Sequence, residues 1–174
     1  MTSVSDRSAG AFDNASGVVT VLEAARSLSD VDVGVLITDA EELGLAGARA
    51  WARSRDARSL VVLNCDGVDD AGPIIVMRGS SALDETVARA AASCGSTVRV
   101  RRMIPGILTD SIAFADAGAL SVTFSRGTTW SLMRVHSPRD DLSRLRGTGI
   151  AETASVLAAT ARAVLESTER KWKS

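Results

Sequence analysis

The stretch from residue 33 to residue 44 constrains the fold of this chain most. It opens with an apolar run, Val33-Gly34-Val35-Leu36-Ile37, which predicts a buried β-strand. Apolar residues then recur at helical spacing and predict a helix over residues 43–54. Glu41 and Glu42 lie at this junction between strand and helix. Ligands of open α/β sheets bind at the carboxyl ends of the strands, so the junction is a candidate site.

The two adjacent carboxylates should have different roles, because neighbouring side chains cannot point the same way. One of them could hold a metal ion while the other handles a proton. The alternative is that Glu41 and Glu42 are solvated residues near a helix N-terminus, where the helix dipole favours negative charge. This stretch alone does not decide between the two interpretations.

The rest of the chain alternates strand and helix patterns. Helices are expected over residues 18–28, 83–92 and 150–168, a short helix or turn over 109–116, and strands over 60–67, 73–77, 97–103 and 119–124. Residues 126–139 form a long loop, and long loops in compact domains tend to be functional. The alternation predicts an α/β fold, a three-layer α/β/α sandwich with a mostly parallel, mixed sheet.

Composition limits the classes of partner. A chain of 174 residues (1–174) is long enough for one domain with a sizeable core, and its polar residues 1–9 are expected to be flexible. A net charge of −1 and 3% aromatic residues argue against nucleic acid or an anionic membrane as the main partner. We expect a cytoplasmic protein, because the chain has no apolar run of about 20 residues and no apolar signal region.

Three further polar residues stand out: Asp13 before the first predicted helix, Asp66 after a predicted strand and His136 in the long loop. Asp13, Asp66 and His136, the only histidine, each have an ordinary explanation as a turn former, a helix cap or a surface residue. Together with the two glutamates, however, they would bring carboxylates and one imidazole to a single edge of the sheet. Zinc is the cation that most often uses such a mixture of oxygen and nitrogen ligands.

These residues resemble the co-catalytic di-zinc aminopeptidases, the group that contains bacterial leucyl aminopeptidases and the related glutaminyl cyclases. Five segments in the family's order carry the resemblance: Gly10-Ala11-Phe12-Asp13-Asn14-Ala15-Ser16-Gly17, Asp39-Ala40-Glu41-Glu42-Leu43-Gly44-Leu45-Ala46-Gly47-Ala48, Asn64-Cys65-Asp66, Thr109-Asp110-Ser111-Ile112-Ala113-Phe114 and Val135-His136-Ser137-Pro138-Arg139-Asp140. The resemblance implies a zinc-exopeptidase fold, one or two zinc ions and a peptide substrate.

The resemblance also implies a role for each metal ligand. Asp13 would bridge two zinc ions and be followed by a cis peptide bond to Asn14. Asp66 and His136 would complete one metal site, and Glu42 would bind the other ion.

Two more roles follow from the same resemblance. Glu41 would be the general base that takes a proton from a zinc-activated water, and Asp110 would orient the histidine through its other ring nitrogen. The implied activity is hydrolysis that removes N-terminal residues from peptides.

The chain departs from the family pattern at one metal ligand. The family supplies a histidine from a His-x-Asp segment upstream of the bridging aspartate, and residues 1–12 contain no histidine. The histidine of the family's Ser-Asp-His segment is replaced by Ser111. The family's leading strands also have no counterpart, which predicts an exposed sheet edge and makes self-association plausible.

Three interpretations stay open. The chain is N-terminally truncated relative to the family and is an active aminopeptidase once the missing ligand is supplied. Alternatively, it is a single-zinc relative of the glutaminyl cyclases, with zinc held by Asp13, Glu42 and His136. The third interpretation is a non-catalytic, metal-deficient binding protein with a peptidase-like fold.

Overall fold

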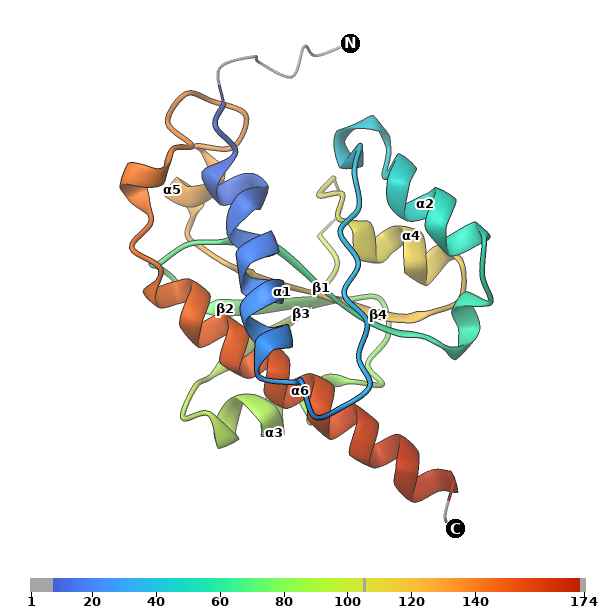
Figure 1. Ribbon diagram of the computed structural model, residues 1–174. Helices are drawn as coiled ribbons and strands as arrows, with labels where there is room; N and C mark the ends of the chain where they lie inside the picture. The colour runs from blue at the N-terminus through green and yellow to red at the C-terminus, as the bar shows by residue number, and fades with distance from the viewer. Residues whose placement is uncertain (1–7, 105, 173–174) are drawn as a thin grey trace.

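The structure, a computed structural model, describes residues 8–104 and 106–172. Its sheet contains β1 (Val61–Val68), β2 (Ile74–Arg78), β3 (Val98–Arg102) and β4 (Leu120–Arg126), in the spatial order β1-β4-β2-β3 (Figure 1). The pairs β1–β4 and β2–β3 are parallel, and β2–β4 is antiparallel. The predicted mixed sheet of an α/β fold is confirmed.

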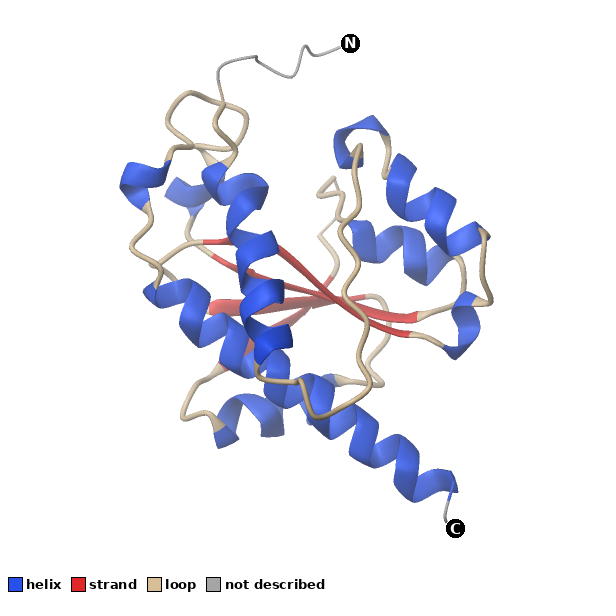
Figure 2. Cartoon of the chain, in the orientation of Figure 1, coloured by secondary structure: helices blue, strands red, loops and turns tan. Residues whose placement is uncertain are grey.

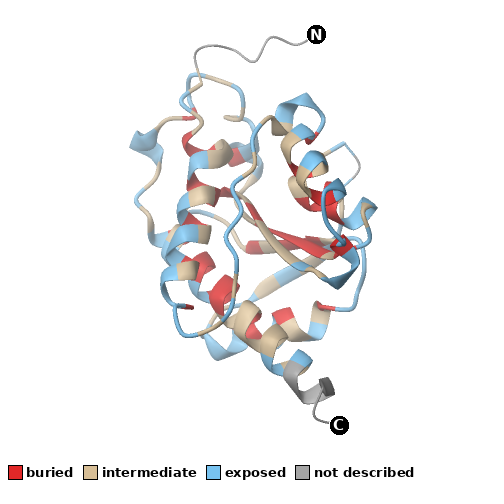
Figure 3. Cartoon of the chain, turned by 45° about the vertical axis from the view of Figure 1, so that its right-hand side comes forward, coloured by how far each residue is buried: buried red, intermediate tan, exposed pale blue. Residues whose placement is uncertain are grey.

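Helices cover both faces of the sheet (Figure 2). One face carries α1 (Gly17–Arg26), α3 (Asp84–Ser93) and α6 (Thr148–Trp172), and the other carries α2 (Ala46–Arg53) and α4 (Asp110–Asp116). The larger core, which includes Phe124 and Val156, lies under the first set. A smaller core around Leu45 and Phe114 lies under the second set. Buried residues therefore gather where helices face the sheet, as Figure 3 shows.

Residues 33–38 do not form the predicted strand. Their backbone has no strand partner among the described residues, and the side chains of Val35, Leu36 and Ile37 are 44%, 40% and 59% exposed. The prediction is wrong here because a strand needs a neighbour to pair its N–H and C=O groups, and the sheet ends at β1. The apolar run is therefore an extended, unpaired segment.

The predicted helix over residues 43–54 is divided in two. A single 3₁₀ turn, Glu41–Leu43, comes first, and α2 begins only at Ala46. The interruption has a local cause, because Gly44 and Leu45 both adopt left-handed backbone conformations, with φ of 76° and 63°.

The remaining elements follow the predictions closely. The long loop after β4 contains one short helix, α5 (Thr129–Leu132). Of residues 1–9, which were expected to be flexible, residues 1–7 lie outside the described residues. Across the described ranges, we find no helix that combines the length and the apolar character needed to cross a lipid bilayer.

Candidate metal centre and active site

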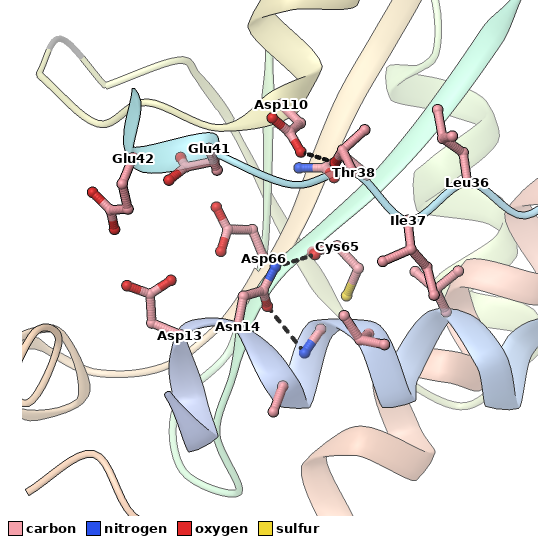
Figure 4. Close-up of a pocket in the computed structure, with 15 residues that line it drawn as sticks. Asp13, Asn14, Leu36, Ile37, Thr38, Glu41, Glu42, Cys65, Asp66 and Asp110 are labelled. Atoms are coloured by element: carbon pink, nitrogen blue, oxygen red, sulfur yellow. Dashed lines mark hydrogen bonds between the residues drawn. The ribbon is translucent and has the colours of Figure 1, made fainter. Parts of the chain in front are cut away.

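A cavity of about 310 Å³ opens at the carboxyl end of β1 (Figure 4). Five of the six residues singled out in the sequence line this cavity: Asp13, Glu41, Glu42, Asp66 and Asp110. The sixth, His136, contacts two of these carboxylates from the loop that follows α5. Segments far apart in the sequence therefore meet at the edge of the sheet where ligands of α/β proteins usually bind.

Asp13 lies in a kinked segment, Ala11–Ser16, in which its own backbone is not helical. The peptide bond from Asp13 to Asn14 is cis, as the resemblance implied. The Asn14 side chain fastens this segment to the end of β1: its Oδ1 accepts a hydrogen bond from Gly67 N and its Nδ2 donates one to Cys65 O, each at 3.1 Å. The sheet thus fixes the position of the aspartate.

A buried aspartate that the sequence reasoning did not assign supports the same segment. Asp140 is 1% exposed, and its carboxylate accepts hydrogen bonds from the backbone N–H of Phe12 at 2.6 Å and of Asp13 at 3.1 Å. Asp140 closes the sequence segment that begins at Val135, so its place in that segment was the available signal. Asp140 thus joins the loop that carries His136 to the segment that carries Asp13.

The short turn Glu41–Leu43 presents the two glutamates in different directions. In Figure 4, the Glu42 carboxylate turns towards Asp13, whereas the Glu41 carboxylate lies on the side of Asp66. The chain just before the turn packs tightly against α2, because a Cβ added to Gly47 would lie 2.5 Å from the Asp39 carbonyl oxygen. The expected difference in direction between the two side chains is present.

His136 completes a compact group with Asp13 and Glu42. Its Nε2 lies 3.3 Å from Asp13 Oδ2 and is hydrogen-bonded to Glu42 Oε1. The three residues can offer ligand atoms that all lie within 4.8 Å of one another. The resemblance placed His136 with Asp66 and Glu42 with the other ion, and this division of the ligands stays a prediction.

The loop that carries His136 is anchored to the end of β1. Asp69, which is 7% exposed, accepts a hydrogen bond from Ser131 Oγ at 2.6 Å and forms an ion pair with Arg134. Ser131 also forms a capping box with Thr128 at the start of α5. These contacts hold the loop in place while His136 adopts a left-handed backbone conformation with φ of 57°.

The cavity concentrates negative charge. Burial, followed by repulsion from neighbouring carboxylates, raises the pKa of Asp66 and of Glu41 to about 7. Burial also raises the pKa of Asp13, although the nearby His136 opposes that effect. For His136, burial lowers the pKa, but the hydrogen bond and the charge of Glu42 outweigh it and raise the pKa overall. A cation bound here would relieve this repulsion.

Asp110 lines the cavity at the N-terminus of α4. Burial raises its pKa, and its carboxylate accepts a hydrogen bond from the Thr38 hydroxyl, which opposes that effect. Thr38 is a residue that the sequence reasoning did not assign. The predicted role of Asp110 in orienting His136 stays a prediction.

Asp13, Glu42 and His136 are residue types that bind zinc and could together hold one ion. Tetrahedral zinc with nitrogen and oxygen ligands at about 2.0–2.2 Å places those ligand atoms about 3.3–3.6 Å apart. The separation between His136 Nε2 and Asp13 Oδ2 is 3.3 Å, within that range, whereas His136 Nε2 and Glu42 Oε1 are hydrogen-bonded directly and would move apart to bind the same ion. Three protein ligands would leave a fourth position open, as catalytic zinc sites do.

Comparison with known proteins places the chain among peptidases. Peptidase family M28 matches residues 2–161. A zinc aminopeptidase from Bacillus subtilis, BSAP, is 26% identical, with a TM-score of 0.78 over 90% of this chain and 43% of its own. The aminopeptidase from Aneurinibacillus sp. strain AM-1 is 25% identical, with a TM-score of 0.75 over 90% of this chain and 40% of its own.

Another solved structure supports the fold alone. The aminopeptidase LapA from Legionella pneumophila is 18% identical, with a TM-score of 0.76 over 91% of this chain and 47% of its own. The comparison with curated proteins gives no match. The chain spans less than half the length of the solved aminopeptidases named above. Because the family match extends over most of the sequence, the chain belongs to peptidase family M28.

Proposed function

We propose that this chain carries the zinc-binding part of an aminopeptidase-type hydrolase that removes N-terminal residues from peptides. The observation that supports this proposal is the group Asp13, Glu42 and His136, whose two carboxylates line one cavity together with Glu41. The solved aminopeptidases named above have the same fold over the matched part.

The proposed chemistry divides between a cation and a carboxylate. A zinc ion held by the three-residue group would polarise the scissile carbonyl and lower the pKa of an attacking water. The Glu41 carboxylate accepts the proton of that water and delivers it to the departing amine. Burial and repulsion from neighbouring carboxylates raise the pKa of Glu41 to about 7 in the metal-free chain, and a bound cation would lower it towards the range in which the carboxylate is ionised and can accept a proton.

We propose one zinc ion per chain. A second ion would have only Asp13 and Asp66 as ligands from this set, and structural or catalytic zinc sites use at least three protein ligands. Asp66 would therefore bind a second zinc ion only if a further ligand, beyond Asp13 and Asp66, completed that second site.

The first test is Glu41→Gln, which keeps the shape of the side chain and removes its basicity. Hydrolysis of leucine p-nitroanilide by the zinc-loaded chain should fall by at least about 100-fold, while zinc content stays unchanged. Glu23→Gln, at an exposed glutamate of α1, is the matched control and should retain full activity. Full activity in Glu41→Gln would exclude the assigned base, and a zinc-loaded chain without activity would contradict the hydrolase proposal.

A second candidate function is supported by the grouping of ligands. The set Asp13, Glu42 and His136 is the one that the resemblance implies for the single zinc of glutaminyl cyclases. A peptide with N-terminal glutamine separates the two functions. Release of ammonia would identify the cyclase, whereas release of the first residue would identify the aminopeptidase.

A further inference from the structure

One arginine joins segments that carry different candidate metal ligands. The Arg134 guanidinium donates a hydrogen bond to the Asp69 carboxylate, and its central carbon lies 5.8 Å from the centre of the Phe12 ring. Phe12 directly precedes Asp13, and His136 follows Arg134 by two residues. In Figure 1 the orange loop after α5 accordingly lies beside the start of the blue segment that leads into α1. We call Arg134, Asp69 and Phe12 the arginine clamp.

The arginine clamp is shielded from water. The side chains of Arg134 and Asp69 are 16% and 9% exposed, and Phe12 is 2% exposed. Asp69 is itself fixed to the sheet, because its N–H donates a hydrogen bond to the Arg126 carbonyl at the end of β4, at 2.8 Å. Loss of one partner of a buried ion pair leaves the other charge without compensation, so the two side chains stay together.

The Phe12 ring is held by the end of β1 as well as by the arginine. A Cβ added to Gly67 would lie 2.7 Å from this ring, so the ring packs directly on the backbone there. Gly67 has a left-handed backbone conformation with φ of 65°, which a residue without a Cβ adopts easily. The segment that carries Asp13 therefore cannot shift without disturbing its contacts with both β1 and Arg134.

The backbone of Arg134 begins the turn that presents the histidine. Its carbonyl accepts hydrogen bonds from the Ser137 N–H at 3.1 Å and from the Ser137 hydroxyl at 2.6 Å. His136 lies inside this turn in a left-handed backbone conformation, which a residue with a side chain keeps only where its surroundings enforce it. A displacement of Arg134 would therefore displace the imidazole.

We propose that Arg134 is a positioning residue for the metal site, and that the arginine clamp sets the separation between His136 and Asp13. None of the three clamp residues is among those that line the cavity, so the clamp acts through the ligands that it holds. Its effect on zinc affinity rests on the proposed zinc site. Its effect on the position of the imidazole is independent of zinc.

The contacts of the clamp require an arginine. A planar guanidinium can bind a carboxylate while it lies over an aromatic ring, whereas a lysine ammonium is a compact point charge. Arg134→Lys keeps the charge without this geometry, and Arg134→Met removes the charge from a side chain of similar width. The loss of function should therefore be larger in Arg134→Met than in Arg134→Lys.

The first test observes the imidazole without metal. His136 is the only histidine, so its ring gives one isolated set of NMR signals in the full chain. These signals should differ from those of a solvated histidine, because the ring contacts two carboxylates. In Arg134→Met they should shift towards the solvated position, and the Ser137 amide should exchange faster. Unchanged methyl signals of Val156, in the larger core, would show that the variant remains folded.

The second test is calorimetric zinc titration. Affinity should fall by at least about tenfold in Arg134→Met and by less in Arg134→Lys, as it does when residues that orient metal ligands are removed. Arg139→Met, at an exposed arginine of the same loop, is the matched control and should change neither zinc affinity nor the imidazole signals. Unchanged imidazole signals in Arg134→Met would overturn the proposal. An unchanged chain that binds no zinc would instead contradict the proposed function, while the imidazole signals still test the clamp.

A double variant separates positioning from neutralisation of charge. Arg134→Met alone leaves the Asp69 carboxylate buried without its partner, whereas Asp69→Asn combined with Arg134→Met leaves no unpaired charge and should fold. The double variant still lacks the clamp, so its imidazole signals should stay near the solvated position and its zinc affinity should stay low. Recovery of both in the double variant would show that Arg134 only neutralises Asp69, and would overturn the positioning role.

Discussion

At the scale of single residues, Asp140 links the two segments that supply Asp13 and His136. Asp140→Ala should lower the free energy of unfolding by about 2–4 kcal/mol, because it leaves the buried N–H groups of Phe12 and Asp13 without an acceptor. Urea unfolding would measure this as a lower midpoint with an unchanged m-value. The neighbouring Asp141→Ala is the control, since Asp141 is only partly buried and caps only a short turn.

A loss in Asp140→Ala no larger than that in the control would show that the carboxylate does not hold the segment. Zinc affinity should fall together with stability in Asp140→Ala and stay unchanged in Asp141→Ala.

The sequence predicted the chemistry-bearing residues better than their supports. Asp13, Glu42 and His136 could be named because their residue types and order resemble a family. The roles of Asp140 and Thr38 could not be named, because a hydrogen bond between segments distant in sequence leaves no local pattern. The contacts of His136 with Asp13 and Glu42 also depend on the position of a loop, which the sequence does not specify.

At the scale of elements, the start of α1 depends on a close approach to β1. A Cβ on Gly17 would lie 2.5 Å from the Cys65 carbonyl oxygen, so Gly17→Ala should force the helix away from the strand. We expect a loss of about 3 kcal/mol in the free energy of unfolding. Gly34→Ala is the matched control, because no atom lies within 4 Å of the added Cβ.

Chemical denaturation of both variants would measure the difference. Similar stabilities for Gly17→Ala and Gly34→Ala would contradict the close packing of α1 on the end of β1.

The prediction of elements failed at the segment of residues 33–38. Periodicity and apolar character indicate which side chains a segment can bury, and for residues 33–38 they predict a strand. Pairing, however, is a property of two segments, and β1 has no described partner on that side. The four described strands and the major helices were predicted because each carries a complete local pattern.

At the scale of the whole molecule, the carboxylates of the cavity make stability depend on pH. The folded-state pKa values of Asp66 and Glu41 are about 7, above their ordinary values of 3.8 and 4.5. The folded protein therefore holds these protons to a higher pH than the unfolded chain. Their contribution to stability is present below the ordinary values and is lost as pH rises towards about 7.

The Tm of the zinc-free protein should consequently fall when the pH is raised from about 5 to about 7.5. The raised pKa of His136 acts in the same direction. Zinc should raise the Tm more at the higher pH, because it binds deprotonated ligands. Scanning calorimetry at both pH values would measure this, and a zinc-free Tm that rises over this range would contradict the assigned shifts. Asp66→Asn should reduce the dependence on pH.

The central claim is that Asp13, Glu42 and His136 together hold zinc, and calorimetric zinc titration of the metal-free chain tests it most directly. We expect one zinc ion per chain, with affinity reduced by at least about 100-fold, or about 2.7 kcal/mol, in Glu42→Gln and in His136→Asn. Asp66→Asn should bind almost as tightly as the unchanged chain. Zinc binding that is lost in Asp66→Asn but kept in Glu42→Gln, or absent from the unchanged chain, would exclude a zinc site built from Asp13, Glu42 and His136.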